Sequence, residues 1–143
     1  MQLEELADTF EMLGEWEERY RYLIELGRKL EPLPPGQKIE ANKVRGCLSQ
    51  VWMTVRSEPG PPLTLHFLGE SDGVITKGLI VVLFMLYSGR TPQQILDTDV
   101  TSAFARLGLD NHLTMNRRSG FYAMVERVRL LAARAAAGET SSA

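Results

Sequence analysis

Asn42-Lys43-Val44-Arg45-Gly46-Cys47-Leu48-Ser49-Gln50-Val51-Trp52 is the stretch around which this chain is organised, and it holds the only cysteine. Gly46 precedes that cysteine and can adopt backbone angles closed to other residues, so the chain can turn sharply there. A thiol at the tip of a turn that leads into a strand is well placed to meet another molecule. Free cysteines are also among the most buried residue types, and most behave as small hydrophobes. On position alone, Cys47 is therefore either a reactive thiol or a core residue.

The chain before this stretch has the pattern of two helices and a stiff loop. Apolar residues at helical spacing predict a short first helix: Leu3, Leu6, Phe10 and Leu13. Gly14 ends that helix. We expect a second, amphipathic helix from about residue 15 to 30, with a charged outer face. Residues 31–38 contain three prolines and a glycine, which predict a loop with restricted backbone freedom.

Two strand-like runs follow the cysteine. Apolar residues alternate with other types in residues 51–56 and again in 63–68, and a segment rich in proline separates the runs. This pattern predicts an antiparallel hairpin. A third strand is expected at about residues 43–45, so the sheet would have about three strands.

Helical patterns fill the rest of the chain. The first, about residues 73–87, is apolar nearly all round, which is typical of a buried central helix. The others are expected at about residues 91–96, 100–107 and 114–136. The order of these elements predicts the α+β class, because helices are followed by a small antiparallel sheet and then by more helices. We expect one domain over residues 1–143, with its core at about 10–137 and a flexible tail at 138–143.

The composition excludes several classes of protein. The 143 residues carry a formal net charge of −2 without a long basic run, so we expect no nucleic-acid partner. One cysteine and two histidines are too few for a Cys-rich zinc site or an iron–sulfur cluster within the chain, and we expect no metal. A lone thiol fits a reducing compartment. The N-terminus resembles no targeting signal and the longest apolar run, residues 79–86, is too short to cross a bilayer. We expect a cytoplasmic protein without a membrane partner.

Polar groups near the ends of the expected elements are candidates for chemistry: Cys47, Ser71, Asp72, His112, Arg117 and Arg118. Phosphate-loop, nucleophile-elbow and zinc-protease motifs are absent from the sequence. If Cys47 met His66 or His112, the pair would suit a Cys–His hydrolase. A carrier that accepts a group on Cys47 and hands it on is the competing interpretation, and a thiol redox sensor is a third.

Ordered motifs between Trp16 and Met124 favour the carrier. They are Trp16-Glu17-Glu18-Arg19-Tyr20, Ile24-Glu25-Leu26-Gly27, Val44-Arg45-Gly46-Cys47-Leu48-Ser49-Gln50-Val51-Trp52, Gly69-Glu70-Ser71-Asp72-Gly73-Val74-Ile75-Thr76-Lys77-Gly78-Leu79, Thr91-Pro92, His112-Leu113-Thr114, Arg117 and Gly120-Phe121-Tyr122-Ala123-Met124. In these motifs the chain resembles the SufE family (also CsdE), the sulfur acceptors of cysteine desulfurases in iron–sulfur cluster assembly. It departs from the family pattern at Leu48, where Gln is frequent, and at Met115, where Pro is common.

This resemblance implies a fold and a function. The fold would be the small α+β sandwich also seen in IscU-type scaffolds. Cys47 would take persulfide sulfur from a pyridoxal-phosphate (PLP) desulfurase of the SufS or CsdA type, stimulate that enzyme, and pass the sulfur to a scaffold or another acceptor. The chain would be an accessory protein rather than an enzyme, with no cofactor of its own. Residues implied to support the cysteine loop or the partner are Gly46, Ser49, Gln50, Asp72, Lys77, His112 and Arg117.

Overall fold

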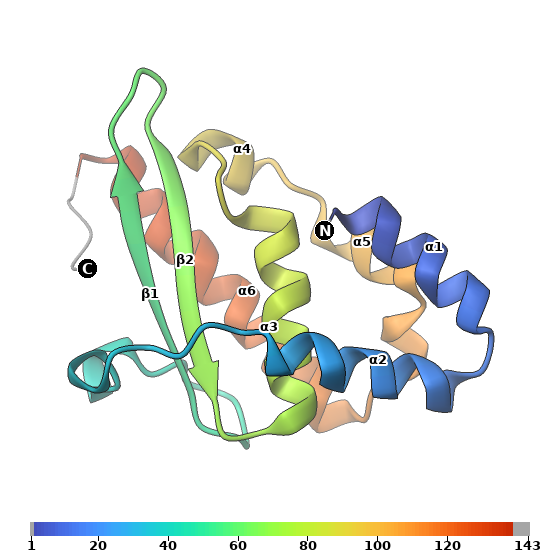
Figure 1. The fold of residues 1–143 in the computed structure, drawn as a ribbon. Helices are drawn as coiled ribbons and strands as arrows, with labels where there is room; N and C mark the ends of the chain where they lie inside the picture. The colour runs from blue at the N-terminus through green and yellow to red at the C-terminus, as the bar shows by residue number, and fades with distance from the viewer. Residues whose placement is uncertain (1, 139–143) are drawn as a thin grey trace.

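The computed structural model describes residues 2–138 and has the α+β fold that the sequence predicts (Figure 1). Its helices and strands, in chain order, are α1 (Leu3–Leu13), α2 (Trp16–Arg28), β1 (Val51–Glu58), β2 (Thr64–Ser71), α3 (Val74–Tyr87), α4 (Pro92–Leu96), α5 (Val100–Leu107) and α6 (Met115–Ala136). Short 3-10 turns occupy Pro35–Gln37, Glu40–Asn42 and Leu109–Asn111. Apart from Gly138, the expected flexible tail lies outside the described residues.

Within residues 2–138 the sheet consists of β1 and β2 alone, which pair antiparallel from Val51 opposite Ser71 to Glu58 opposite Thr64. The third strand expected at residues 43–45 is reduced to a single bridge between Lys43 and Trp52. The reason is local. A 3-10 turn precedes the bridge, and the backbone of Gly46, at φ +91°, turns the chain away immediately after it.

Helix α3 is the centre of the molecule. It lies beside β2 and packs against α2, while α6 runs behind the sheet (Figure 1). As its all-round apolar sequence predicts, α3 is largely buried, with Leu79, Ile80, Val82 and Leu83 at most 1% exposed. Buried residues from α1, both strands, α5 and α6 complete one hydrophobic cluster around it.

Helices α2 and α3 cross at two glycines. A Cβ placed on Gly78 would lie 2.2 Å from the backbone oxygen of Leu23, and one on Gly27 would lie 2.7 Å from the backbone nitrogen of Gly78. The two helix backbones are thus in direct contact, which is possible only without side chains at the crossing. The crossing fixes the position of α3 relative to α2 along the helix axis. It thereby places the first turn of α3 beside the cysteine loop.

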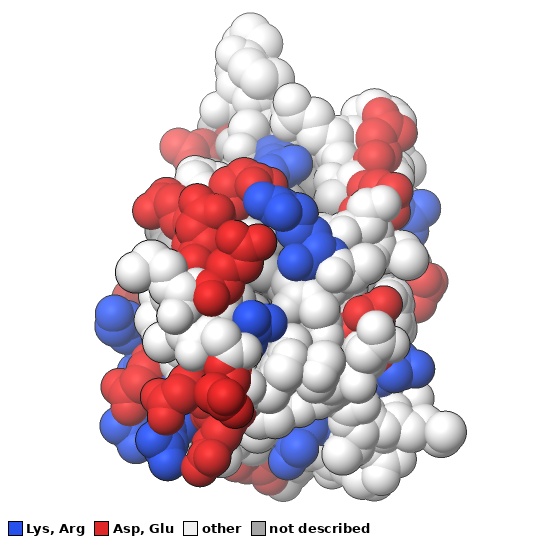
Figure 2. Space-filling view, turned by 90° about the vertical axis from the view of Figure 1, so that its right-hand side faces the viewer, with Lys and Arg blue, Asp and Glu red and all other residues white. Residues whose placement is uncertain are grey.

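The side of the molecule formed by α1 and α2 is rich in acidic side chains (Figure 2). Several are paired with arginines in exposed ion pairs, such as Arg106 with Glu4 at 2.6 Å and Arg28 with Glu25 at 2.7 Å. Exposed pairs of this kind contribute little to stability, because water screens the charges and both side chains lose freedom. The fold therefore depends on its apolar cluster more than on this charged surface. Among the described residues, no helix is both long and apolar enough to cross a membrane.

Candidate functional site

Cys47 lies half-buried in the loop that joins the Lys43 bridge to β1. The positive φ of Gly46 directs the next residue inward, and a Cβ on this glycine would lie 3.3 Å from Cβ of Ala123 in α6. The Cys47 thiol donates a hydrogen bond to the Gly120 carbonyl oxygen, with Sγ and oxygen 3.4 Å apart. The loop is therefore folded against α6, and Gly120 is the point of contact.

A pocket of about 320 Å³ opens beside the thiol. Its lining comes from the cysteine loop, the first turns of α3 and α6, and the middle of α6: Cys47, Leu48, Ser49, Thr76, Leu79, Thr114, Asn116, Arg117, Gly120, Phe121 and Met124. The Thr114 hydroxyl caps α6 by accepting from the Arg117 backbone N–H at 3.2 Å. The Arg117 guanidinium has no hydrogen bond or ion pair with another residue in 2–138, so it brings a free positive charge to the pocket. Positive charge and a helix N-terminus both favour an anion there.

Both ends of the cysteine loop are tied to neighbouring backbone. At the start, the Val44 N–H donates to the Val51 carbonyl oxygen at 2.8 Å. At the end, the Gln50 N–H donates to Asp72 Oδ1 at 2.9 Å, and the Asp72 N–H donates back to the Gln50 carbonyl oxygen at 3.3 Å. These contacts fix both ends of the loop, and between them the Cys47 thiol contacts Gly120.

Side-chain packing supports the two hydrogen bonds between Gln50 and Asp72. The Ser49 and Thr76 hydroxyl oxygens are 3.5 Å apart. A Cβ on Gly73 would lie 2.6 Å from Ser49 Oγ, so a side chain at position 73 would displace the serine. Of the residues implied by the resemblance, the structure thus gathers Gly46, Ser49, Gln50, Asp72 and Arg117 around Cys47.

Burial raises the pKa of the Cys47 thiol, because the thiolate loses hydration in the half-buried loop. We expect the rate of alkylation by iodoacetamide to rise with pH along a curve whose midpoint lies above about 8.5, the pKa of an exposed thiol. The same shift links stability to pH. At pH values below the pKa of Cys47 in the unfolded chain, the protonated thiol contributes its full stabilisation, and this contribution is lost as the pH rises through the pKa in the folded protein. The measurement is a pH series of alkylation rates, with urea-unfolded protein as the reference. A folded midpoint at or below the unfolded one would contradict the assignment.

Two of the implied residues lie elsewhere. Lys77 is on the side of α3 that faces α2, against Gly27. Lys77 also acts weakly on Glu70. Lys38 donates a hydrogen bond to the Glu70 carboxylate and holds the pKa of that carboxyl below its usual value, and the charge of Lys77 lowers the same pKa by a smaller amount. The His112 ring stacks on Trp16 with centroids 3.9 Å apart, and its Nδ1 lies 2.9 Å from the Gly108 carbonyl oxygen.

Neither histidine lines the Cys47 pocket. His66 is on the sheet, with Nε2 2.8 Å from the Glu58 carboxylate near the hairpin turn. A Cys–His hydrolase requires an imidazole base in contact with its thiol. The structure offers the Cys47 thiol no imidazole base within its own pocket. Within residues 2–138, no group of three or more His, Cys, Asp or Glu side chains is placed to hold a metal ion.

The surface around the pocket is unusually apolar. Leu48 is 81% exposed, Val74 63% and Met115 81%. These three residues, here called the apolar rim, come from the cysteine loop and the first turns of α3 and α6. Sequence reasoning counted Val74 among the apolar positions of a buried helix, which is wrong for this residue, and it gave no role to Gly120. A signal for Gly120 existed, because a glycine within a helix costs about 1 kcal/mol relative to alanine and so points to a packing reason.

Comparisons with known proteins extend this picture. A family model described as "SufE: Fe-S metabolism associated domain" matches residues 4–132. An uncharacterized SufE-like protein of Rhizobium meliloti (strain 1021) is 39% identical over 129 aligned residues, and the match covers 89% of this chain and 91% of that protein. A hypothetical protein from Thermus thermophilus, solved in solution, has the same fold with a TM-score of 0.74. It is 22% identical, and the match covers 94% of this chain and 96% of that one.

Proposed function

Because this chain belongs to the SufE family, we propose that it carries sulfur, as a persulfide on Cys47, for iron–sulfur cluster assembly. The family's association with Fe–S metabolism supports a sulfur-transfer role. The proposed donor is a PLP-dependent cysteine desulfurase of the SufS or CsdA type. The proposed receiver is an Fe–S scaffold or another sulfur acceptor.

The transfer step uses the thiol alone. The Cys47 thiolate attacks the outer sulfur of the donor's cysteine persulfide and forms a new S–S bond. The S–S bond of the donor breaks, and the donor cysteine leaves as a thiolate with the bonding electron pair. Cys47 then holds the sulfur as a persulfide. By removing sulfur from the desulfurase, this exchange frees that enzyme for another turnover, which is how the chain would stimulate it. PLP stays in the partner, and the chain needs no cofactor. We place the exchange in the cytoplasm, where a lone thiol stays reduced.

The observation that carries the proposal is the half-buried Cys47 thiol, which rests on Gly120 beside a pocket with a free arginine. A thiol with a raised pKa is a slow nucleophile in the free protein. The loop is held at its two ends and turns at Gly46, so it can swing out while its ends stay in place. In the folded-back position the pocket would shelter a persulfide from reductants. We infer that docking of the desulfurase extends the loop and makes the thiol reactive.

Intact-protein mass spectrometry tests the proposal. The chain is incubated with a cysteine desulfurase, PLP and free cysteine, beside a Cys47→Ser variant. We expect the wild type to gain the mass of one sulfur atom, removable by reductant, and the variant to gain none, because serine cannot form a persulfide. A second arm compares iodoacetamide rates with and without the desulfurase. Faster alkylation in the complex would support docking-induced exposure.

Two outcomes would contradict the proposal. An equal mass gain in the Cys47→Ser variant would place the sulfur on another group. No gain with any SufS- or CsdA-type desulfurase would return Cys47 to the role of a buried structural thiol. Equal alkylation rates in the free and docked protein would remove the inference about the loop but leave the carrier role intact.

A further inference from the structure

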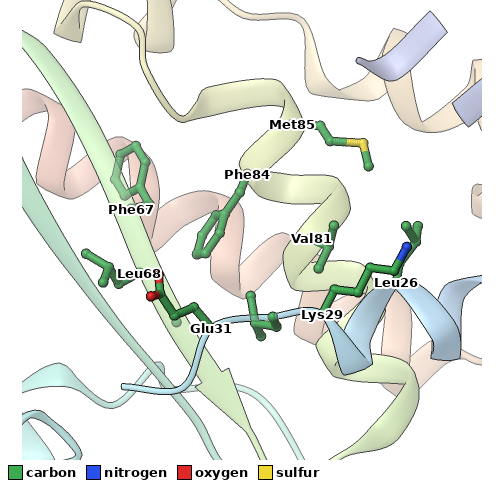
Figure 3. Close-up of a pocket in the computed structure, with 10 residues that line it drawn as sticks. Leu26, Lys29, Glu31, Phe67, Leu68, Val81, Phe84 and Met85 are labelled. Atoms are coloured by element: carbon green, nitrogen blue, oxygen red, sulfur yellow. The ribbon is translucent and has the colours of Figure 1, made fainter. Parts of the chain in front are cut away.

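Helix α3 packs tightly on β2, away from the cysteine loop. The pocket of about 520 Å³ in Figure 3 lies at this packing and shares no lining residue with the Cys47 pocket. Phe84 points from α3 toward β2, and its ring stacks on Phe67 with centroids 6.3 Å apart. A Cβ on Gly69 would lie 3.0 Å from the Phe84 ring and 3.4 Å from Ile80. Strand β2 and α3 therefore form a fixed support, and the segment that leads to Cys47 rests on α6.

A guanidinium of α6 anchors the start of that segment. Arg127 Nη2 donates to the Ala41 carbonyl oxygen at 3.0 Å, across 86 residues of sequence. Ala41 belongs to the 3-10 turn that comes just before the Lys43 bridge. Arg127 does not line the Cys47 pocket, so its bond lies outside the site described above.

Two further contacts lie in line with this anchor. Gly46 packs on Ala123, whose Cβ would lie 3.3 Å from a Cβ on the glycine, and the Cys47 thiol donates to the Gly120 carbonyl oxygen. Residues three and four apart are neighbours on a helix surface, so positions 120, 123 and 127 share one side of α6. They extend over about 10 Å of helix, at about 1.5 Å per residue. The segment therefore lies along α6 in the opposite chain direction, with the guanidinium at one end of the row of contacts and the thiol at the other.

The anchored position is unfavourable for the charge of Arg127. The side chain is half-buried, and burial, together with the nearby charge of Arg134, lowers the pKa of its guanidinium. Within residues 2–138 it forms no ion pair, and its buried Nε has no hydrogen-bond partner. Burying a charge costs free energy unless the charge is paired or hydrogen-bonded. The bond to the Ala41 carbonyl is the compensation that the structure shows, which points to a role for this bond.

We propose that Arg127 is a positioning residue for sulfur transfer: by holding Ala41 on α6, it keeps the following segment aligned with the helix and the Cys47 thiol seated on Gly120. Without the anchor, the segment is free to move away from α6, and the thiol loses its contact. Arg127 acts through the backbone of the segment and not on the thiol itself. The purpose of this arrangement rests on the proposed function, in which the thiol of the free carrier stays idle until a desulfurase docks.

The charge of Arg127 and its anchoring bond have opposite expected effects on the thiol. A positive charge near a cysteine favours the thiolate, so loss of the charge alone would slow alkylation. Loss of the anchor would bring the thiol nearer to water, which also favours the thiolate, and would speed alkylation. Among the described residues that line the Cys47 pocket, Arg117 carries the only charge, and every variant below keeps it. The sign of the change therefore separates positioning from electrostatics.

The test measures iodoacetamide alkylation of the free full-length protein over a pH series, without a desulfurase. Arg127→Met removes the guanidinium and keeps an unbranched apolar stem that suits a helix. We expect its alkylation near neutral pH to be at least about threefold faster than in the parent, with a midpoint at lower pH, because a thiol nearer to water ionises more readily. Arg127→Lys keeps a donor and a positive charge, and is expected to stay within about twofold of the parent because the bond to Ala41 is a single one.

Arg129→Met is the matched control. Arg129 also lies on α6 and also donates to a backbone carbonyl, that of Leu96 at 2.9 Å, but this carbonyl belongs to the end of α4 rather than to the cysteine segment. We expect the alkylation profile of this control to match that of the parent. Urea denaturation checks that each variant is folded under the assay conditions. If Arg127→Met is not, Arg127→Gln replaces it, with the same faster alkylation expected because the shorter side chain does not reach Ala41.

Several outcomes would overturn the proposal. Alkylation of a folded Arg127→Met protein at the parent's rate would do so, and a slower rate would assign the residue an electrostatic role instead. Equal acceleration in Arg129→Met or in Arg127→Lys would also overturn it, because loosening of α6 or loss of the arginine stem would then explain the result. The carrier role is tested separately, since a chain that gains no sulfur from any desulfurase would still show or lack this effect on alkylation.

Discussion

The Gly78→Val variant is expected to lose about 3 kcal/mol of stability or more, at the upper end of what overpacking costs. A Cβ at position 78 would lie 2.2 Å from the Leu23 carbonyl oxygen and 2.8 Å from the carbonyl carbon. Both atoms belong to the backbone of α2, so they cannot rotate away as a side-chain end can. Relief requires α2 and α3 to separate, which would open the apolar cluster that α3 fills.

Urea denaturation followed by circular dichroism measures this effect. Gly36→Ala is the matched control, because a Cβ there has no atom within 4 Å and the backbone has no left-handed strain. We expect that control to stay within about 0.5 kcal/mol of the parent, as surface substitutions usually do. A Gly78→Val protein as stable as Gly36→Ala would show that the helices do not cross at this glycine.

Sequence periodicity predicted most of this fold because the core is built from faces that a local pattern reveals. The apolar run of α3 indicates burial on every side, and the structure buries most of it, although Val74 in the first turn is 63% exposed. The hairpin follows from two alternating runs around a proline-rich turn. These are short-range properties, in which each residue's neighbours in sequence decide its conformation. The third strand was wrong in extent because the Gly46 turn permits only one bridge, and no periodicity measures so short a pairing.

The site was harder to predict because it depends on contacts between distant segments. Cys47 and Gly120 are 73 residues apart, and nothing in either stretch says that they meet. The family resemblance indicated which residues to examine, but not which of them converge. Arg117 lines the pocket, whereas Lys77 turns toward α2 and Glu70. A step of one residue, about 100° around the helix axis, decides this difference for α3, since Thr76 lines the Cys47 pocket and its neighbour Lys77 does not.

The double variant Leu48→Glu/Met115→Glu is expected to slow sulfur transfer from the desulfurase at least about tenfold, which corresponds to about 1.4 kcal/mol. Both side chains are 81% exposed; Leu48 lines the Cys47 pocket and Met115 stands in sequence between Thr114 and Asn116, which also line it, so we expect a partner that reaches the thiol to cover them. In the wild type, burial of that apolar surface stabilises the complex by about 25 cal/mol per Å² removed from water. The glutamates reverse the effect, because two carboxylates would be desolvated without partners. Initial rates of the one-sulfur mass gain, at desulfurase concentrations below saturation, measure the change.

Two comparisons separate docking from chemistry in this experiment. Met12→Glu replaces an apolar side chain that is 87% exposed on α1, outside the Cys47 pocket, and should transfer sulfur like the wild type. Alkylation of the free double variant by iodoacetamide measures how far the two carboxylates, one of them on the residue after Cys47, disfavour the thiolate. A loss of sulfur transfer larger than the loss of alkylation then means that the apolar rim recognises the partner rather than activating Cys47. Transfer as fast as in Met12→Glu would mean that the desulfurase approaches the thiol from another side, past Asp72 and the Gln50 end of the loop.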